Sequence, residues 1–155
     1  MTTTPKWRQL GRRSLAAGCL AASGALAALA IPHGTPWPVP EAAKKVANPV
    51  KATPQALAAA KKIYVEVCAQ CHGDTGKGDG TEAMMYTVKP ANFTEKHMMD
   101  SMTDGEIFYK ITEGRRPMPS FKNSLTEEQR WQLVHFVRTF AKESKKAQPK
   151  QTHKH

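Results

Sequence analysis

The sequence predicts an all-α protein whose single domain contains three main helices. Three segments between residues 53 and 142 place apolar residues at helical spacing, and each begins at a threonine that suits a helix cap. No stretch alternates apolar and polar residues in the manner of a half-buried strand, so almost no sheet is expected. A length of 155 residues with 40% apolar residues fits one packed domain of ordinary size.

Residues 1–31 precede this domain and have the pattern of an export signal. Residues 14–31 contain no charged side chain and end in Ala28-Leu29-Ala30, the small-x-small form that a signal peptidase cuts. They follow four basic residues, Lys6, Arg8, Arg12 and Arg13. Because residues 14–31 also reach the length of a membrane-spanning helix, a cleaved signal peptide and a retained membrane anchor helix both remain open. In either case the domain is expected at the periplasmic side of the inner membrane, anchored there or soluble in the periplasm.

Two low-complexity segments flank the domain, which is expected at residues 53–142. Residues 32–52 contain five prolines and few large apolar side chains, so they are expected to form an extended, polyproline-like linker. Residues 143–155 are rich in lysine and are expected to form a solvated basic tail. The whole net charge of +10 lies on residues 1–53 and 141–155, because the residues between them have equal numbers of acidic and basic side chains. A balanced domain argues against nucleic acid as a partner.

Capping residues define the predicted first and third helices. Thr53 precedes Pro54, and proline is favoured at the first position of a helix. Thr126 is followed by Gln129, which completes a capping box. The apolar face of the first helix is expected to contain Leu57, Ala60, Tyr64 and Val67. The corresponding stripe of the third helix is expected to contain Leu133, Phe136, Val137 and Phe140.

The predicted second helix lies between these two and has signals at both ends. Thr103 and Glu106 have the spacing of a capping box, and Gly114 is a typical helix terminator. Ile107 and Ile111 lie one turn apart and are expected to be buried. The three helices together are expected to surround the functional site.

Cys68-Ala69-Gln70-Cys71-His72 follows the first helix directly and carries the chemistry of the chain. Two cysteines at this spacing on a helical turn place both sulfurs on the same side, and His72 points in a neighbouring direction. This geometry suits two thioether bonds from Cys68 and Cys71 to one haem, with the imidazole of His72 on the iron. We therefore expect one covalently bound haem c as the cofactor.

A zinc site and a thiol redox site are the alternatives for this motif. Zinc would need a fourth ligand, usually from a second Cys/His pair, and a redox CxxC motif would need a βαβ context; the sequence has neither. The export signal also places these thiols where c-type haem is attached. The third cysteine, Cys19, lies inside the apolar stretch and is interpreted as a small apolar residue.

The sixth position on the iron decides whether the haem carries electrons or binds a substrate. Met118 is the predicted ligand, because Pro117 and Pro119 stiffen a non-helical segment around it. Packing in the core is the alternative role for Met118, and His97 is the rival ligand. Five other methionines are expected to line the haem crevice or a loop: Met84, Met85, Met98, Met99 and Met102.

These motifs occur in a definite order along residues 53–142. They comprise Tyr64, Cys68, Cys71, His72, Gly73, Thr103-Asp104-Gly105-Glu106-Ile107, Gly114, Met118-Pro119-Ser120-Phe121, Leu125-Thr126-Glu127-Glu128 and Phe136-Val137. In these residues the segment resembles a class I monohaem cytochrome c, in the small bacterial form that also occurs as a subunit of membrane electron-transfer complexes.

The resemblance implies a cytochrome c-like fold in which the first and last helices cross. It further implies that His72 and Met118 ligate the iron, that an exposed haem edge passes single electrons, and that the backbone carbonyl region at Pro90 faces His72. Ala60 and Phe136 depart from the pattern, because family members often have Gly and Tyr at these positions. The larger side chain at Ala60 is expected to widen the helix crossing slightly.

The expected function is one-electron transfer by a covalent haem with His/Met ligation, without substrate turnover. The chain would act as an exported carrier or as the cytochrome c subunit of a membrane respiratory complex, with redox proteins as partners and a membrane contact through residues 1–31. Two alternatives remain open: a haem enzyme or gas sensor with an open sixth position, and a structural haem subunit of a larger complex. Arg115 and Arg116 would meet a haem propionate, an acidic partner surface or solvent.

Overall fold

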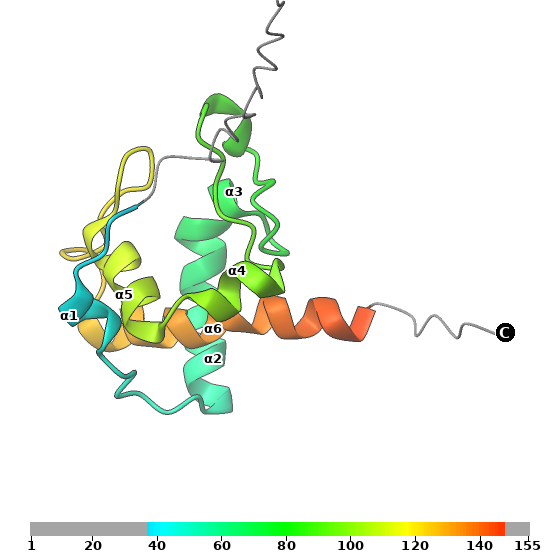
Figure 1. Cartoon of the computed structure of the whole chain (residues 1–155). Helices are drawn as coiled ribbons and strands as arrows, with labels where there is room; N and C mark the ends of the chain where they lie inside the picture. Colours follow the sequence, from blue (N-terminus) through cyan, green and yellow to red (C-terminus); the bar gives the residue numbers. More distant parts are fainter. Residues whose placement is uncertain (1–36, 148–155) are drawn as a thin grey trace, which may run out of the picture. The chain divides into compact units, whose positions relative to one another are not determined.

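The structure is a computed structural model that describes residues 37–147, with side chains described as far as residue 142. The expectations for residues 1–31 lie outside the described residues, as do those for residues 148–155 of the tail. Figure 1 shows the order of the helical elements: α1 (Glu41–Lys44), α2 (Pro54–Ile63), the π-helical turn η1 (Tyr64–Cys68), α3 (Ala69–His72), the 3-10 turn η2 (Ala83–Met85), α4 (Lys96–Ser101), α5 (Asp104–Glu113) and α6 (Glu127–Ala147).

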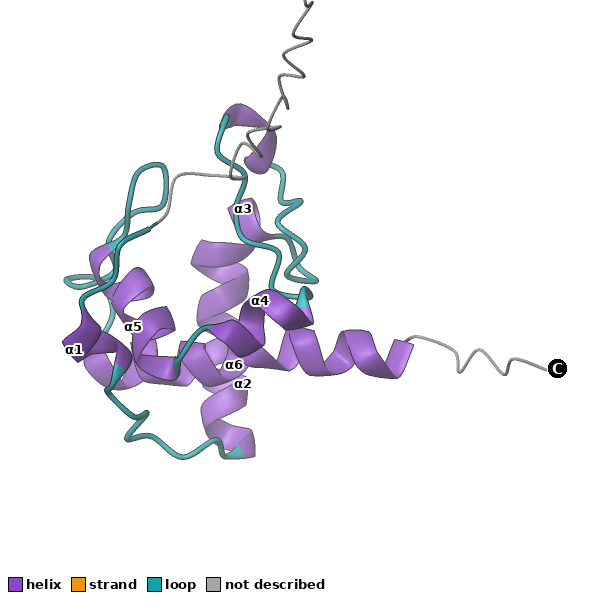
Figure 2. Cartoon of the chain, in the orientation of Figure 1, coloured by secondary structure: helices purple, strands orange, loops and turns teal. Residues whose placement is uncertain are grey.

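The all-α prediction is confirmed for this part of the chain. Figure 2 shows helices joined by loops, with no strand among the residues it colours. The described residues contain a single isolated β-bridge, between Arg115 and Met118. Three predicted helices correspond to α2, α5 and α6, whereas the short elements α1, η2 and α4 are additions that no periodic pattern indicates, because they span less than two helical turns.

Helix α2 begins where the capping pattern predicts. Thr53 Oγ1 accepts a hydrogen bond from the backbone N–H of Ala56 at 3.1 Å, and Pro54 occupies the first helical position. After Ile63 the chain widens into η1, whose hydrogen bonds span five residues instead of four. The wider spacing turns Val67 outward, leaving 40% of its surface exposed, so the expectation that Val67 shares the buried face does not hold.

Helices α5 and α6 begin at their predicted caps, with one difference between them. Thr126 N donates to Gln129 Oε1 at 2.8 Å and Gln129 N donates to Thr126 Oγ1 at 3.2 Å, which is a complete capping box. Thr103 Oγ1 accepts from Glu106 N at 3.1 Å, but the Glu106 carboxylate instead binds Lys110 Nζ at 2.7 Å. An ion pair within the helix thus replaces the second half of the predicted box.

Helices α2 and α6 cross and share the hydrophobic core (Figure 1). Ala60 of α2 is fully buried. The ring of Tyr64 packs against Phe136 and Phe140 of α6, with 5.2 Å between ring centroids in each pair. The two departures from the family pattern, Ala60 and Phe136, therefore both belong to the contact between the first and last main helices.

Arg138 of α6 forms hydrogen bonds with three other residues of the fold. The pattern of apolar residues in the sequence does not indicate this role. Its Nε lies 2.6 Å from Asp104 Oδ1 at the start of α5. Its Nη1 and Nη2 donate to the backbone carbonyls of Met99 and Met102, at 2.8 and 2.7 Å. The guanidinium thus fixes the end of α4 and the segment that leads into α5.

We expect the substitution Arg138→Met to lower the free energy of unfolding by about 2 kcal/mol, because two carbonyls and one carboxylate lose a charged donor. Chemical denaturation of the holoprotein measures this loss. Lys142→Met, an exposed position on the same helix, is the control and is expected to change the free energy by less than about 0.5 kcal/mol. Equal effects of the two substitutions on the free energy of unfolding would contradict the stabilising role of the Arg138 hydrogen bonds.

Residues 37–50 pack on the domain, which differs from the extended linker expected for this segment, and we call them the N-terminal strap. Val39 is buried, and α1 packs against α5 (Figure 1). The contact is so close that a Cβ atom at Gly105 would lie 2.0 Å from the carbonyl oxygen of Ala43. Asn48 Nδ2 donates to the carbonyl of Trp131 at 3.1 Å. The strap therefore makes contacts with the rest of the domain that its proline-rich composition does not indicate.

Helix α6 continues to Ala147, past the end of the predicted domain at residue 142. Alanine, lysine and glutamate are good helix formers, so the helix extends into the first residues of the segment expected to be a tail. Within residues 37–147, none of the helices combines the length and the apolar character that a membrane crossing requires.

Candidate haem site

The helical turn after α2 presents the two cysteines of the motif. Cys68 ends η1 and Cys71 lies in α3; both side chains are half-buried and neither forms a disulfide. Burial, and secondarily the charge of Cys71, raise the pKa of the Cys68 thiol to about 12. Burial, followed by the neighbouring Glu82, also raises the pKa of Cys71. Both thiols therefore stay protonated in the folded chain without a metal, and both lie on one helical turn as two thioether bonds to a single haem require.

His72 is oriented by a backbone carbonyl and by an aromatic ring. Its Nδ1 lies 3.2 Å from the carbonyl oxygen of Ala91, and its ring stacks on Phe93 with 4.5 Å between centroids. Burial lowers the pKa of His72, while the bond to Ala91 opposes this shift. A neutral imidazole that donates from Nδ1 keeps the lone pair of Nε2 for a metal. His72 therefore has the protonation and the support of a proximal iron ligand.

The carbonyl that faces His72 belongs to Ala91, one residue after the expected Pro90. The Pro90 carbonyl is instead close to the loop that follows the Cys-x-x-Cys-His motif, residues 73–80, because a Cβ atom at Gly78 would lie 2.6 Å from it. Gly78 has a φ of 74°, a backbone conformation that favours glycine. The loop therefore approaches Pro90 closely, and the next carbonyl along the chain reaches the imidazole.

The loop after the motif is fixed to the end of α3. Gly78 N donates to the carbonyl of His72 at 2.8 Å, and Gly80 N donates to that of Cys71 at 3.2 Å. These bonds satisfy carbonyl groups that the end of a helix leaves without partners. The buried hydroxyl of Tyr64 donates to the carbonyl of Gly73 at 2.8 Å. Tyr64 thus connects the core of the helix crossing to the first residue after the haem motif.

We expect Tyr64→Phe to lower the free energy of unfolding by about 1–3 kcal/mol, because the Gly73 carbonyl loses its buried donor. Burial, and then the charges of Cys68, Asp74 and Asp79, raise the pKa of Tyr64. The folded state therefore retains the proton more strongly than the unfolded state, and this stability is lost as the pH rises above about 10.

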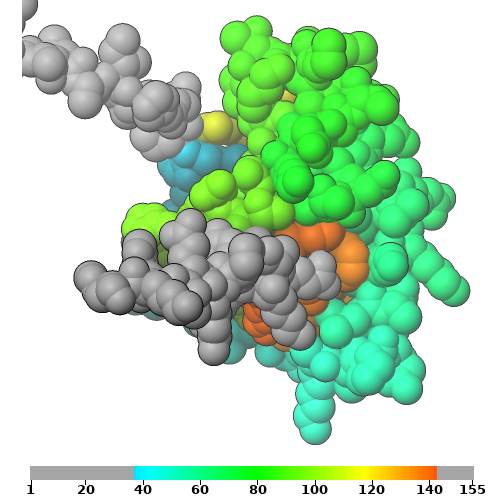
Figure 3. Space-filling view, turned by 90° about the vertical axis from the view of Figure 1, so that its right-hand side faces the viewer, coloured from blue at the N-terminus to red at the C-terminus, as the bar shows by residue number. Residues whose placement is uncertain are grey.

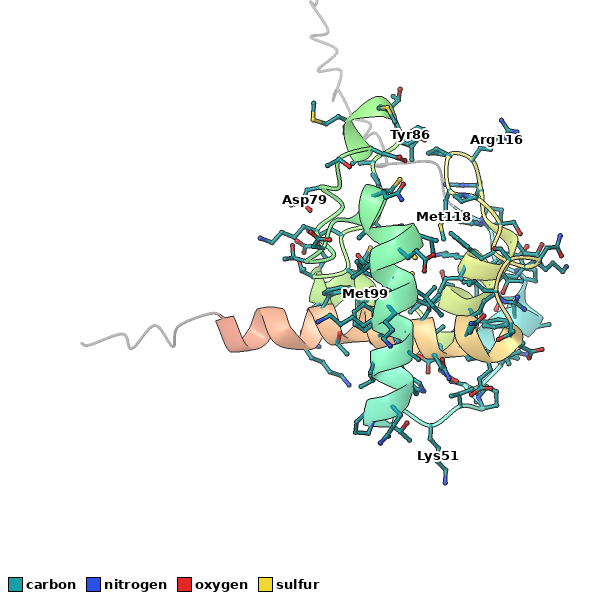
Figure 4. The ribbon with its side chains drawn as sticks, turned by 180° about the vertical axis from the view of Figure 1, so that it is seen from behind. Lys51, Asp79, Tyr86, Met99, Arg116 and Met118 are labelled. Carbon is teal, nitrogen blue, oxygen red and sulfur yellow. The ribbon has the colours of Figure 1, made fainter. Side chains whose placement is uncertain are left out.

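Denaturation at several pH values tests both effects of Tyr64→Phe. The variant is expected to lose less stability than the wild type above about pH 10, because it lacks the titrating hydroxyl. Tyr86→Phe is the control, because it removes a tyrosine hydroxyl from a loop that lies far from the helix crossing in Figure 4. A Tyr64 variant as stable as the Tyr86 variant would refute the role of the Gly73 bond.

Met118 lies in a short turn that its own backbone closes. Arg115 N donates to the Met118 carbonyl at 3.0 Å, and Met118 N donates to the Arg115 carbonyl at 2.9 Å. Gly114, with a φ of 65°, leads into the turn, where a Cβ atom would lie 2.5 Å from the carbonyl oxygen of Pro119. In Figure 4 Met118 lies on the side of its loop that faces the haem-motif helix, while Arg116 lies at the outer tip.

The segment after Met118 is held by a buried arginine that the sequence analysis missed. Arg130 of α6 is 8% exposed, and its Nη1 donates to the carbonyls of Lys122 at 2.9 Å and Leu125 at 2.5 Å. Its guanidinium carbon also lies 5.4 Å from the centroid of the Phe108 ring. A cation on the apolar face of a helix, next to Trp131, is the only signal in the sequence that could have indicated this role.

The remaining candidate ligands have other surroundings. Met84 and Met85 are 86% and 69% exposed, in the segment that projects at the top of Figure 3 (green). Met99 is buried in the core. His97 is exposed on α4, whereas Met118 is half-buried and packs against the core cluster. Among residues 37–147, no three His, Cys, Asp or Glu side chains group together as metal ligands would.

The donor set fits a haem. It contains two thiols on one helical turn, an imidazole whose Nδ1 is directed at a backbone carbonyl, and a half-buried thioether in a closed turn. An all-α domain whose first and last main helices cross, with a Cys-x-x-Cys-His motif at the end of the first, defines a c-type cytochrome of class I with one haem.

Comparison with known families agrees with this class. Residues 55–137 match the family described as Cytochrome C oxidase, cbb3-type, subunit III, which is more than half of the chain. The chain belongs to this family of cytochrome c domains, and its cofactor is a covalently bound haem c with its iron. A comparison with curated proteins finds no match.

Solved structures include similar chains. A chain of the Kuenenia stuttgartiensis reducing HAO-like protein complex Kustc0457/Kustc0458 is 32% identical, with a TM-score of 0.52 and coverage of 59% of this chain and 46% of that chain. This chain thus spans less than half the length of that protein. The KustC0563 c-type cytochrome is 29% identical, with a TM-score of 0.47 and coverage of 52% of this chain and 95% of that chain.

Proposed function

We propose that this chain transfers single electrons through its haem c, with His72 and Met118 as the axial ligands of the iron and no substrate turnover of its own. The observation that carries the proposal is that backbone contacts hold both candidate ligands. The carbonyl of Ala91 orients His72, and two hydrogen bonds with Arg115 close the turn of Met118. Ligands held in this way need little rearrangement when the charge of the iron changes.

The residues of the chain tune the haem, which supplies a one-electron couple when bound. His72 presents the lone pair of Nε2 to the iron, because its Nδ1 is directed at the carbonyl of Ala91. Met118 presents a soft, weak sulfur donor that favours the reduced iron and raises the potential relative to a second histidine. If both side chains held the iron, no coordination position would remain for a substrate.

The absorption spectrum of the holoprotein tests the ligand pair. We expect the oxidised protein to have the weak near-infrared band of sulfur-to-iron charge transfer and the reduced protein to exclude carbon monoxide. Met84→Ala, at an 86% exposed position, is the control and is expected to leave both properties unchanged. A high-spin spectrum, or ready binding of carbon monoxide by the wild type, would contradict the proposal and favour a haem enzyme or gas sensor.

We further propose that the redox partners are proteins on the periplasmic side of the inner membrane, which the chain meets as an exported carrier or as the cytochrome c subunit of a membrane complex. The match to a family described as an oxidase subunit supports the second form, as does the similarity to a chain of a protein complex. Membrane fractionation, copurification and N-terminal mass test the proposal. A haem-loaded protein confined to the cytoplasm with an intact N-terminus would contradict export.

A further inference from the structure

The N-terminal strap reaches the turn that carries Met118. Trp37, its first residue, is half-buried, and the guanidinium carbon of Arg115 lies 4.9 Å from the centroid of its ring. Lys110 Nζ, on α5, lies 5.9 Å from the same centroid. A cation over the face of an indole ring is attracted by the ring quadrupole. Trp37 therefore contacts both the helix before the turn and the first residue of the turn.

Arg115 connects this contact to the candidate ligand. Its backbone N–H and carbonyl make the two hydrogen bonds, of 3.0 and 2.9 Å, that close the turn with Met118. A guanidinium fixed on Trp37 restricts the backbone of Arg115 and hence these two bonds. Arg116 is exposed at the tip of the turn (Figure 4), so the two adjacent arginines have different surroundings.

Several contacts distant from Met118 hold the strap on the domain. Trp37 therefore belongs to a segment whose position is fixed by other residues. Val39 is 8% exposed. Further along, Asn48 Nδ2 donates to the carbonyl of Trp131 at 3.1 Å, and the carbonyl of Val50 lies 2.7 Å from His135 Nε2. These contacts attach the strap to α6, so the position of Trp37 does not depend on the turn alone.

We infer that Trp37 is a positioning residue for Met118: the stack of its ring with Arg115 keeps the turn in the conformation in which the sulfur reaches the iron. The inference rests on the proposed ligation by Met118. It adds a residue that lies before the region matched by the family, residues 55–137, and so extends the functional site into the N-terminal strap.

Trp37→Leu in the full-length holoprotein tests this role, because leucine keeps an apolar side chain and removes the ring face. We expect the fraction of reduced haem open to carbon monoxide to rise about two- to thirtyfold, the range that corresponds to a lost cation–π contact. The midpoint potential is expected to fall and the near-infrared band to weaken. Trp37→Phe, which restores a ring face, is expected to recover most of each property.

Val46→Ala is the matched control, because Val46 lies in the same strap and is 48% exposed. It is expected to leave the potential, the band and carbon monoxide exclusion unchanged. Amide hydrogen exchange gives a readout independent of the haem spectrum: the N–H groups of Arg115 and Met118 are expected to exchange faster in Trp37→Leu, with α2 and α6 unaffected. Faster exchange throughout α6 would mean a general loss of stability and would overturn the inference.

Two further outcomes separate this inference from the proposed function. If the wild type has the near-infrared band and Trp37→Leu matches it in potential, band and carbon monoxide exclusion, Trp37 has no positioning role and the function stands. If the wild type itself lacks the band, ligation by Met118 fails, and the role of Trp37 is overturned with it.

Discussion

Replacement of Met118 with alanine is expected to lower the midpoint potential of the haem and to let carbon monoxide bind the reduced protein. The thioether would favour reduced iron; its removal would leave either a harder oxygen ligand such as water, which favours oxidised iron, or an open position that carbon monoxide can enter. The half-buried side chain lies in a turn closed by two backbone bonds with Arg115, and an alanine leaves that backbone intact while removing the sulfur. Spectroelectrochemical titration and the absorption spectrum under carbon monoxide measure the two effects.

Two control substitutions accompany Met118→Ala. Met85→Ala removes a methionine that is 69% exposed and is expected to leave the potential unchanged. His97→Ala removes the rival ligand on α4 and is likewise expected to leave the spectrum unchanged. If Met118→Ala retained the wild-type potential and excluded carbon monoxide, Met118 would be a packing residue, and a changed spectrum in His97→Ala would identify the histidine as the ligand.

The double substitution Cys68→Ala/Cys71→Ala is expected to abolish covalent haem attachment and to remove most of the native helicity. A small domain with short helices buries too little apolar surface to be stable alone, and a large apolar macrocycle fixed inside it supplies much of the missing burial. The far-UV circular dichroism of the variant, and a denaturing gel stained for haem, measure helicity and attachment separately.

The single substitution Cys71→Ala is the matched control, because it keeps one thioether bond and a haem tethered near His72. It is expected to retain more helicity than the double variant. Native-like helicity together with cooperative unfolding in the haem-free double variant would show that the protein chain is stable without its cofactor and would refute the role of the haem in folding.

Local patterns predicted the main helices and the covalent haem c correctly because they act over a few residues. The cap of α2 needs only Thr53 and Ala56, and the box at the start of α6 needs only Thr126 and Gln129. Where a prediction from neighbouring residues was wrong, the cause is also local. Val67 is exposed because the π-helical turn η1 changes the angular spacing of the helix, which a period of 3.6 residues does not describe.

Polar contacts in the interior could not be predicted in the same way. Arg130 and Arg138 lie on the helix that carries the apolar stripe, yet both bind backbone carbonyls of other segments. Such bonds satisfy groups that burial removes from water, and their partners depend on the path of the chain between helices. The carbonyl that orients His72 illustrates the same limit: Ala91, 19 residues away, takes the place expected for Pro90.

The sequence by itself determined the all-α class, the three main helices, the two thiols with their adjacent imidazole, and hence the covalent haem c, because each depends on the spacing of neighbouring residues. Tertiary structure alone decided how the candidate ligands are held. The packing of the N-terminal strap onto α5 and α6 brings Asn48 and Trp131 together across 83 residues, and the same packing places Trp37 on Arg115. Contacts of this range form only when the chain folds, so no local pattern encodes them.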